Sequence, residues 1–171
     1  MEGNILIIGN GSSLLDRENG WQYDKFDTVV RFNSFKIAGF EKHVGTKTDY
    51  WFTVNKYHKK NIKSFKKVFV HSWEHWEDKC EIYLDLSKER DCIKISPEVF
   101  NNIPVQAPST GLIAICYFLN FYNKVYITGF DWWENEKHHY GDQEERGSLH
   151  RIQEEYHIIK QLISKGSVIM V

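Results

Sequence analysis

The sequence has no strong excess of charge, no cysteine pair and no long apolar run, and each absence excludes a class of protein. The 171 residues carry a formal net charge of −1, which argues against a general nucleic-acid binder, because such domains are usually strongly basic. The three cysteines, Cys80, Cys92 and Cys116, form no Cys-x-x-Cys pair, so reduced thiols fit best. No signal peptide and no membrane-spanning run is present. We therefore expect a cytoplasmic protein without a transmembrane segment.

Three sequence motifs that commonly bind phosphate groups are also missing. The segment Gly9-Asn10-Gly11 begins like a dinucleotide-binding turn, but position 14, where a third glycine is needed, is Leu. No Gly-x-x-x-x-Gly-Lys-Ser/Thr loop occurs, which excludes a P-loop protein. There is no Asp-x-Asp pair of the kind with which metal-dependent sugar-diphosphate transferases hold a divalent ion. We therefore expect no metal or other cofactor, and a leaving group of low charge, such as a nucleoside monophosphate.

One weak metal-binding pattern remains in the sequence. His71 and His75 are four residues apart, and Cys80 follows them. A strand is predicted to end at His71, so the helical spacing that would bring the two imidazoles together is not expected. A metal-binding or redox protein stays open as an alternative.

What the sequence does contain is an alternation of strand-like and helix-like segments. An apolar run at residues 4–8 ends at a glycine, which is typical of a buried parallel strand. Further strands are predicted at residues 28–32, 50–54, 67–71, 124–128 and 167–171, and helices at residues 110–120 and 148–165, whereas residues 74–105 give the least clear pattern. We expect one α/β domain over residues 1–171, with a mostly parallel, Rossmann-like sheet flanked by helices.

Two turns in this pattern are candidates for binding an anionic ligand. Residues 5–13 run from an apolar strand into a small polar turn that contains Asn10. At residues 108–112 a polar turn opens a helix, with Ser109 or Thr110 as its N-cap. Both turns would present bare backbone N–H groups and short polar side chains, so they predict a phosphate-containing substrate. On the simpler interpretation they are an ordinary turn and an ordinary helix cap.

Four motifs, in a fixed order, resemble those of the eukaryote-type sialyltransferases, glycosyltransferase family 29. Residues 7–11, 27–33 and 39–48 resemble the large sialylmotif, and residues 108–111 through 125–130 resemble the small one. His139-Tyr140-Gly141-Asp142 is similar to the short third motif, and His150 with Glu155 matches the last, His-x-x-x-x-Glu. Each short motif alone is a weak signal, whereas the ordered set is specific and covers most of the chain outside residues 55–106.

The resemblance implies a metal-independent, inverting transferase of the GT-A-variant fold that uses a CMP-activated sugar acid as donor. The acceptor would be a hydroxyl group of a glycan or glycolipid. Carried over position by position, the resemblance assigns the CMP-sugar donor to Asn10, Gly11, Asn33, Ser109, Thr110, Gly111, Phe130 and His139, with Phe130 beside the cytidine and His139 on the phosphate. It assigns the role of general base to His150.

Some expectations follow from position in the predicted fold. Trp132 and Trp133 follow the strand end at Gly129, where open α/β sheets bind ligands, so we expect them to bind the acceptor. Ser148 is predicted to cap the last helix, which would place His150 just inside it. Glu155 is roughly 140° around that helix from His150, so we expect it to anchor the helix and not to pair with His150.

The sequence also departs from the family pattern. No Cys precedes the first strand, and Tyr122 stands where the family has the Cys of the small motif, which supports a reducing compartment. Gly141 replaces the usual aromatic residue of the third motif. Because the motifs recognise CMP and a carboxylate, a CMP-Kdo-dependent transferase remains an alternative, as does a CMP-binding module without catalysis.

Overall fold

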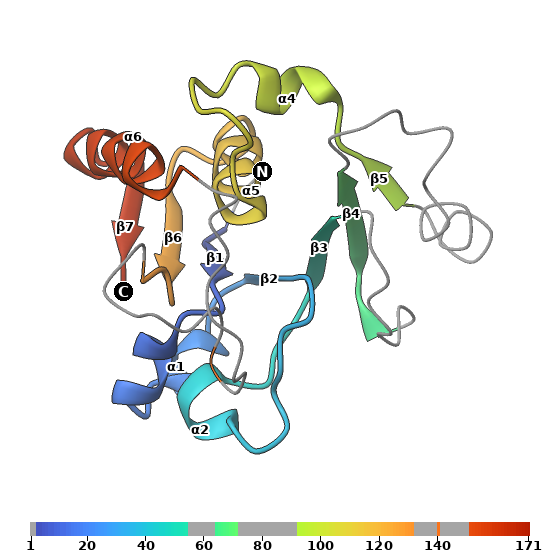
Figure 1. Cartoon of the computed structure of the whole chain (residues 1–171). Helices are drawn as coiled ribbons and strands as arrows, with labels where there is room; N and C mark the ends of the chain where they lie inside the picture. Colours follow the sequence, from blue (N-terminus) through green and yellow to red (C-terminus); the bar gives the residue numbers. More distant parts are fainter. Residues whose placement is uncertain (1–2, 55–63, 72–91, 132–139, 141–150) are drawn as a thin grey trace.

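The computed structural model describes residues 3–54, 64–71, 92–131, 140 and 151–171. The seven described strands form one parallel sheet in the order β5-β4-β3-β2-β1-β6-β7 (Figure 1). Their bounds are Ile5–Ile8 (β1), Thr28–Phe32 (β2), Tyr50–Val54 (β3), Lys67–His71 (β4), Cys92–Lys94 (β5), Val125–Thr128 (β6) and Val168–Met170 (β7). Six of these strands are predicted by the sequence to within two residues at each end, and β5 lies in the segment without a clear pattern.

The helices connect the strands and differ greatly in length. Two longer helices, α5 (Thr110–Leu119) and α6 (Ile152–Ser164), are close to those predicted from the sequence. The short elements are η1 (Ser12–Asp16), α1 (Gly20–Tyr23), α2 (Glu41–Val44) and α4 (Pro97–Asn101). Within the described parts of the chain, no helix is both long enough and apolar enough to cross a bilayer.

One predicted helix boundary is wrong. The N-cap of α6 is Arg151, and the helix begins at Ile152, later than the predicted start after Ser148. Ser148 and His150 themselves lie outside the described residues. The acidic first turn of α6, with Glu154 and Glu155, is favourable near the positive end of the helix dipole.

Alternating side chains of the strands build a core on each face of the sheet. Ile5 and Ile7 of β1 point to the face covered by α5 and α6, and Leu6 and Ile8 point to the face covered by η1, α1 and α2. The largest cluster is packed against α5, whose buried residues include Leu112 and Phe118. Tyr122, at the position of the missing family cysteine, is also buried in that cluster.

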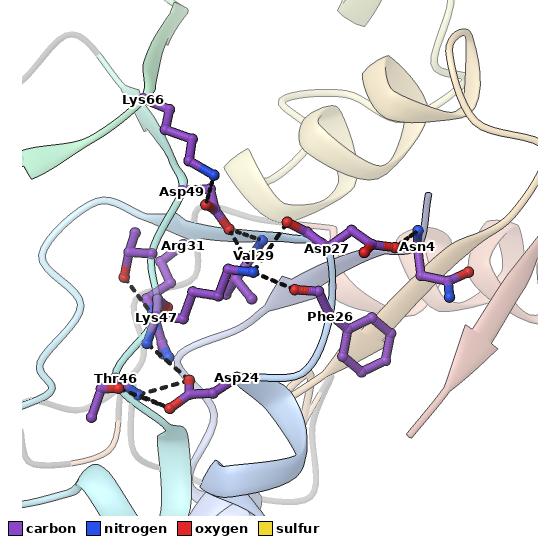
Figure 2. A network of polar contacts seen from close by, with 11 residues as sticks. Asn4, Asp24, Phe26, Asp27, Val29, Arg31, Thr46, Lys47, Asp49 and Lys66 are labelled. Carbon is purple, nitrogen blue, oxygen red and sulfur yellow. Dashed lines mark hydrogen bonds and ion pairs between the residues drawn. The ribbon is translucent and has the colours of Figure 1, made fainter. Parts of the chain in front are cut away.

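A network of polar contacts lies at the end of the sheet where strands β2 and β3 begin (Figure 2). The Asp49 carboxylate accepts a hydrogen bond from the Val29 N–H (2.9 Å) and pairs with Lys66 at 2.7 Å and with Lys47 at 3.6 Å. Burial opposes ionisation of this carboxyl, but the Lys66 ammonium, the Val29 N–H and Lys47 outweigh it and hold the pKa of Asp49 below its ordinary value. Lys47 also donates to the carbonyl oxygen of Phe26, so the network joins the β1–β2 connection to β3.

The buried carboxylate and not its exposed partner should stabilise this edge. We expect Asp49→Ala to lower the free energy of unfolding by about 1–3 kcal/mol, because the buried Val29 N–H loses its acceptor. Lys66 is largely exposed, so Lys66→Ala should change the melting temperature far less. Urea denaturation of both variants checks this, and equal losses would contradict the assignment.

Candidate functional site

The candidate site lies at the edge of the sheet where the parallel strands end. Strand β1 lies between β2 and β6. After β1 the chain adds strands β2 to β5 on one side of it, and then adds β6 and β7 on the other side. In open α/β sheets, ligands bind outside the carboxyl ends of the strands at such a reversal of strand order. Asn10 follows β1, Asn33 follows β2 and Phe130 follows β6, so three residues assigned to the donor site lie at this edge.

Asn10 has a buried side-chain acceptor, Oδ1, that no described residue satisfies. Its side chain is 8% exposed, and its Nδ2 donates to the Phe32 carbonyl oxygen at 3.3 Å, which fixes the orientation of the amide. Among the described residues, no group donates to its Oδ1. A buried oxygen without a donor costs about 1–3 kcal/mol. The side-chain oxygen Oδ1 of Asn10 is thus suited to accept a hydrogen bond from an N–H or O–H group of a ligand.

Asn33 is fixed in place by four hydrogen bonds, one of which its N–H donates to the Phe52 carbonyl oxygen at 3.1 Å. Its φ of 49° lies in the left-handed region, which Asn tolerates better than most residues. Its carbonyl oxygen accepts from the Trp51 indole (3.0 Å), and its side-chain Oδ1 accepts from the Val54 N–H (3.0 Å). The amide nitrogen therefore points to Thr110, 3.4 Å from its Oγ1.

The amino terminus of α5 is held by a carboxylate from α6. Glu155 is 2% exposed and accepts from the Ser109 N–H at 2.7 Å and from the Ser109 hydroxyl at 2.6 Å. The same hydroxyl caps α5 by accepting from the Leu112 N–H at 3.2 Å. The expectation that Glu155 anchors the last helix is confirmed, and the Ser109 hydroxyl is already committed to protein partners.

This arrangement leaves two helix-terminal N–H groups for a ligand. No described residue accepts from the backbone N–H of Thr110 or of Gly111. A Cβ on Gly111 would lie 2.7 Å from the ring of Phe130, so only glycine lets this ring approach the helix. Phe130 also packs edge-on against Phe32, at 5.8 Å between ring centroids. The helix terminus and an aromatic wall thus lie side by side.

Three N–H groups of the first turn are not bare, in contrast to the prediction from the sequence. The Gly9 and Gly11 N–H groups donate to carbonyl oxygens at the end of β6, at 2.7 and 2.9 Å. The Ser13 N–H donates to the Asp131 carboxylate at 2.9 Å, and that carboxylate fills the space beside the Gly11 Cα. For these three N–H groups the prediction is wrong, because two of them bond to backbone carbonyl oxygens at the end of β6 and the third bonds to a carboxylate of the protein. The assignment of Gly11 to the donor site stays a prediction.

Four of the predicted site residues, His139, His150, Trp132 and Trp133, lie outside the described residues, and their roles stay predictions. Tyr140, the next residue after His139, is described and buried. Its N–H donates to the backbone carbonyl oxygen of Asn10 at 2.8 Å, and its hydroxyl donates to the backbone carbonyl oxygen of Lys36. Tyr140 of the third motif is therefore hydrogen-bonded to Asn10 of the large motif.

His71 belongs to this edge, although the sequence suggested it only as a weak zinc ligand. It is the last residue of β4, is 0% exposed, and its Nε2 lies 3.1 Å from the Thr110 Oγ1. Burial lowers the pKa of His71 to about 4, so the imidazole is neutral at pH 7. A polar residue ending a buried strand was the signal in the sequence, because a strand end at this edge faces the site.

The described residues give little basis for the metal-binding or redox alternative. They contain no group of three His, Cys, Asp or Glu side chains that could hold a metal ion, while His75 and Cys80 lie outside them. Burial, with a smaller effect of the Glu155 carboxylate, raises the pKa of the Cys116 thiol to about 11. A thiol that stays protonated at neutral pH is a poor nucleophile.

The bond between Glu155 and Ser109 can be tested with a neighbouring residue as control. Glu155→Ala should lower the free energy of unfolding by about 1–3 kcal/mol, because the Ser109 N–H loses its acceptor. Glu154 precedes it on α6 but is exposed, so Glu154→Ala should have little effect. Urea denaturation measures both, and a similarly small loss for Glu155→Ala would show that the carboxylate does not hold α5.

Comparisons with known proteins agree with the motifs. The sequence profile of glycosyltransferase family 29 (sialyltransferase) matches residues 5–103 and 94–167. The rat and human CMP-N-acetylneuraminate-beta-galactosamide-alpha-2,3-sialyltransferases 4 are each 25% identical over 211 residues, which cover 95% of this chain and 62% of the relative. The human CMP-N-acetylneuraminate-beta-1,4-galactoside alpha-2,3-sialyltransferase is 30% identical over 105 residues, covering 60% of this chain and 28% of the relative.

The fold also has a counterpart among solved structures. A mammalian sialyltransferase superimposes with a TM-score of 0.82 at 18% identity, covering 99% of this chain and 68% of the other. This likeness shows the fold, a GT-A-like α/β arrangement. The match covers about three fifths, 62%, of the length of the rat and human sialyltransferases 4. Since the family profile extends over nearly the whole chain, the protein belongs to glycosyltransferase family 29, the sialyltransferases.

Proposed function

We propose that this chain transfers sialic acid from CMP-sialic acid to a hydroxyl group of a glycan or glycolipid. Two findings support this donor: the chain belongs to the family, and the relatives it matches are named CMP-N-acetylneuraminate alpha-2,3-sialyltransferases. The chain is shorter than those relatives, so the acceptor and the linkage do not follow from them.

The observation that supports the proposal is that one edge of the sheet holds both a hydrogen-bond acceptor, the Asn10 Oδ1, and hydrogen-bond donors, the N–H groups of Thr110 and Gly111. No described residue donates to the Asn10 Oδ1, and a ribose hydroxyl or a cytosine amino group can supply that donor, whereas a fully ionised phosphate cannot. The N–H groups of Thr110 and Gly111 at the start of α5 suit an anionic oxygen. A nucleoside monophosphate has both kinds of group, and it is the leaving group of a CMP-sugar.

The reaction that suits this edge needs no metal ion. The bond between the anomeric carbon of the sugar and the phosphate oxygen breaks, the acceptor oxygen bonds to that carbon, and the acceptor proton passes to a base. Negative charge grows on the departing CMP, and helix-terminal N–H groups aimed at such a charge stabilise it. We assign His139 to the phosphate and His150 to the proton, on the motifs that they occupy.

Nucleotide choice is the first test of the proposal. CMP should stabilise the protein against heat, by about 2.7 kcal/mol when its concentration is a hundred times Kd. Thermal shift and calorimetry with CMP, UMP, GDP and AMP measure the preference. Asn10→Ala should weaken CMP binding, whereas Asn4→Ala, at an exposed position before the same strand, should not. Stronger stabilisation by UDP or GDP than by CMP would overturn the assignment.

Catalysis is the second test. Transfer from CMP-sialic acid should survive EDTA, and His150→Ala should lower kcat by roughly 10²–10⁴-fold while CMP affinity stays nearly unchanged, as expected on loss of a general base. His157→Ala, at an exposed position on α6, is the matched control and should leave kcat unchanged.

The same assay separates the alternatives. Faster transfer from CMP-Kdo than from CMP-sialic acid would change the donor, and CMP binding with only slow donor hydrolysis would favour a non-catalytic module. A loss with EDTA that Mg²⁺ or Mn²⁺ restores would contradict the metal-independent mechanism.

A further inference from the structure

We propose that His71 is a positioning residue that fixes the direction of the Thr110 hydroxyl hydrogen, so that Thr110 donates to an anionic oxygen of the donor substrate. The inference rests on the proposed function, because it names what one residue does at that site. Its basis is a row of three side chains from separate elements: Asn33 after β2, Thr110 at the start of α5, and His71 at the end of β4.

The first step is the count of hydrogen bonds at the Thr110 hydroxyl. A threonine hydroxyl has one hydrogen to donate and two lone pairs that accept. The Asn33 Nδ2, at 3.4 Å, can only donate, and its orientation is fixed because the Asn33 Oδ1 accepts from the Val54 N–H. Asn33 therefore occupies one lone pair of Thr110.

The second step is the role of the His71 Nε2, which lies 3.1 Å from the same oxygen. If Nε2 carries the ring hydrogen, it fills the second lone pair, and the Thr110 hydrogen is directed to a third partner. If Nε2 is bare, it accepts the Thr110 hydrogen, and Thr110 can then only accept from a ligand. The tautomer of His71 thus decides whether Thr110 presents a donor or an acceptor.

The third step is the charge of the ligand. A phosphate or carboxylate oxygen is an acceptor, so it matches Thr110 only when His71 donates through Nε2. Because burial keeps the imidazole neutral at pH 7, only one ring nitrogen carries a hydrogen. The ring is held in contact with Phe52, at 5.8 Å between centroids, and it does not reach solvent. His71 acts through Thr110 and does not contact the donor.

The experiment compares two replacements of His71. His71→Leu removes the donor, whereas the side-chain nitrogen of His71→Gln can occupy the place of Nε2 and can only donate. We expect His71→Leu to weaken binding of CMP by roughly 10- to 100-fold, as for a lost hydrogen bond to a charged group, and His71→Gln to recover most of it. Calorimetry with CMP and with cytidine, and KM and kcat for CMP-sialic acid, supply the readouts.

The choice of ligands separates the possible outcomes. Weaker binding of CMP with unchanged cytidine binding supports a contact to phosphate. A raised KM for CMP-sialic acid with unchanged CMP affinity supports a contact to the sugar carboxylate. An equal loss for cytidine and CMP, or no loss for any ligand, overturns the proposal, because a merely structural role would not follow the charge of the ligand.

A double-mutant cycle tests whether His71 acts through Thr110. In a Thr110→Val background, His71→Leu should cause no further loss of CMP affinity, whereas in Thr110→Ser, which keeps the hydroxyl, the loss should persist. Additive losses would overturn the proposal. If His71→Leu does not fold, His71→Asn, whose amide is too short to reach Thr110, replaces it in the cycle. Absence of CMP binding by the unaltered protein would instead refute the proposed function itself.

Discussion

The carboxylate of Glu155 is the group on which the candidate site depends. It is almost completely buried, a position that an ionised side chain occupies only when hydrogen bonds replace its water. Both of its oxygens accept hydrogen bonds from Ser109, so α6 sets where α5 begins. Because Thr110 and Gly111 follow Ser109 directly, this contact with α6 also helps to fix the position of their N–H groups at the start of α5. Glu155, which matches the last motif, therefore positions the start of α5 at the candidate site.

The sequence predicts the parallel strands well, and it predicts the short elements poorly, for a physical reason. Buried strands such as β1 and β4 are nearly continuous apolar runs next to glycine or polar residues, which makes their bounds visible. Helices α1 and α2 are each four residues long, too short to show a helical period. Strand β5 is a three-residue edge strand, Cys92–Lys94, with a mixed pattern that only its pairing with β4 explains.

The candidate site was predictable where one segment is enough to define a group. Asn10, Asn33 and Thr110 follow strand ends or open a helix, and the topology brings all three to one edge. What the sequence could not reveal are partners distant along the chain. The carboxylate of Asp131 accepts from the Ser13 N–H although 118 residues separate the two in the sequence. The turn for which the sequence predicts an anionic ligand therefore already binds a carboxylate of the protein itself.

The placement of β1 in the interior of the sheet, between β2 and β6, has a consequence for how the chain folds. Ile5 pairs with Thr28 of β2 on one side and with Val125 of β6 on the other. During synthesis β1, whose side chains are all apolar, can therefore pair early with β2, while the N–H and C=O groups of its other edge stay unpaired until β6 has been made. Parallel pairing between such distant segments forms slowly, and an unpaired edge of an apolar strand favours aggregation in the meantime. The position of β1 places Asn10 between the two halves of the sheet. For the same reason we expect the β1–β6 pairing to form slowly and the unpaired strand to favour aggregation until it forms.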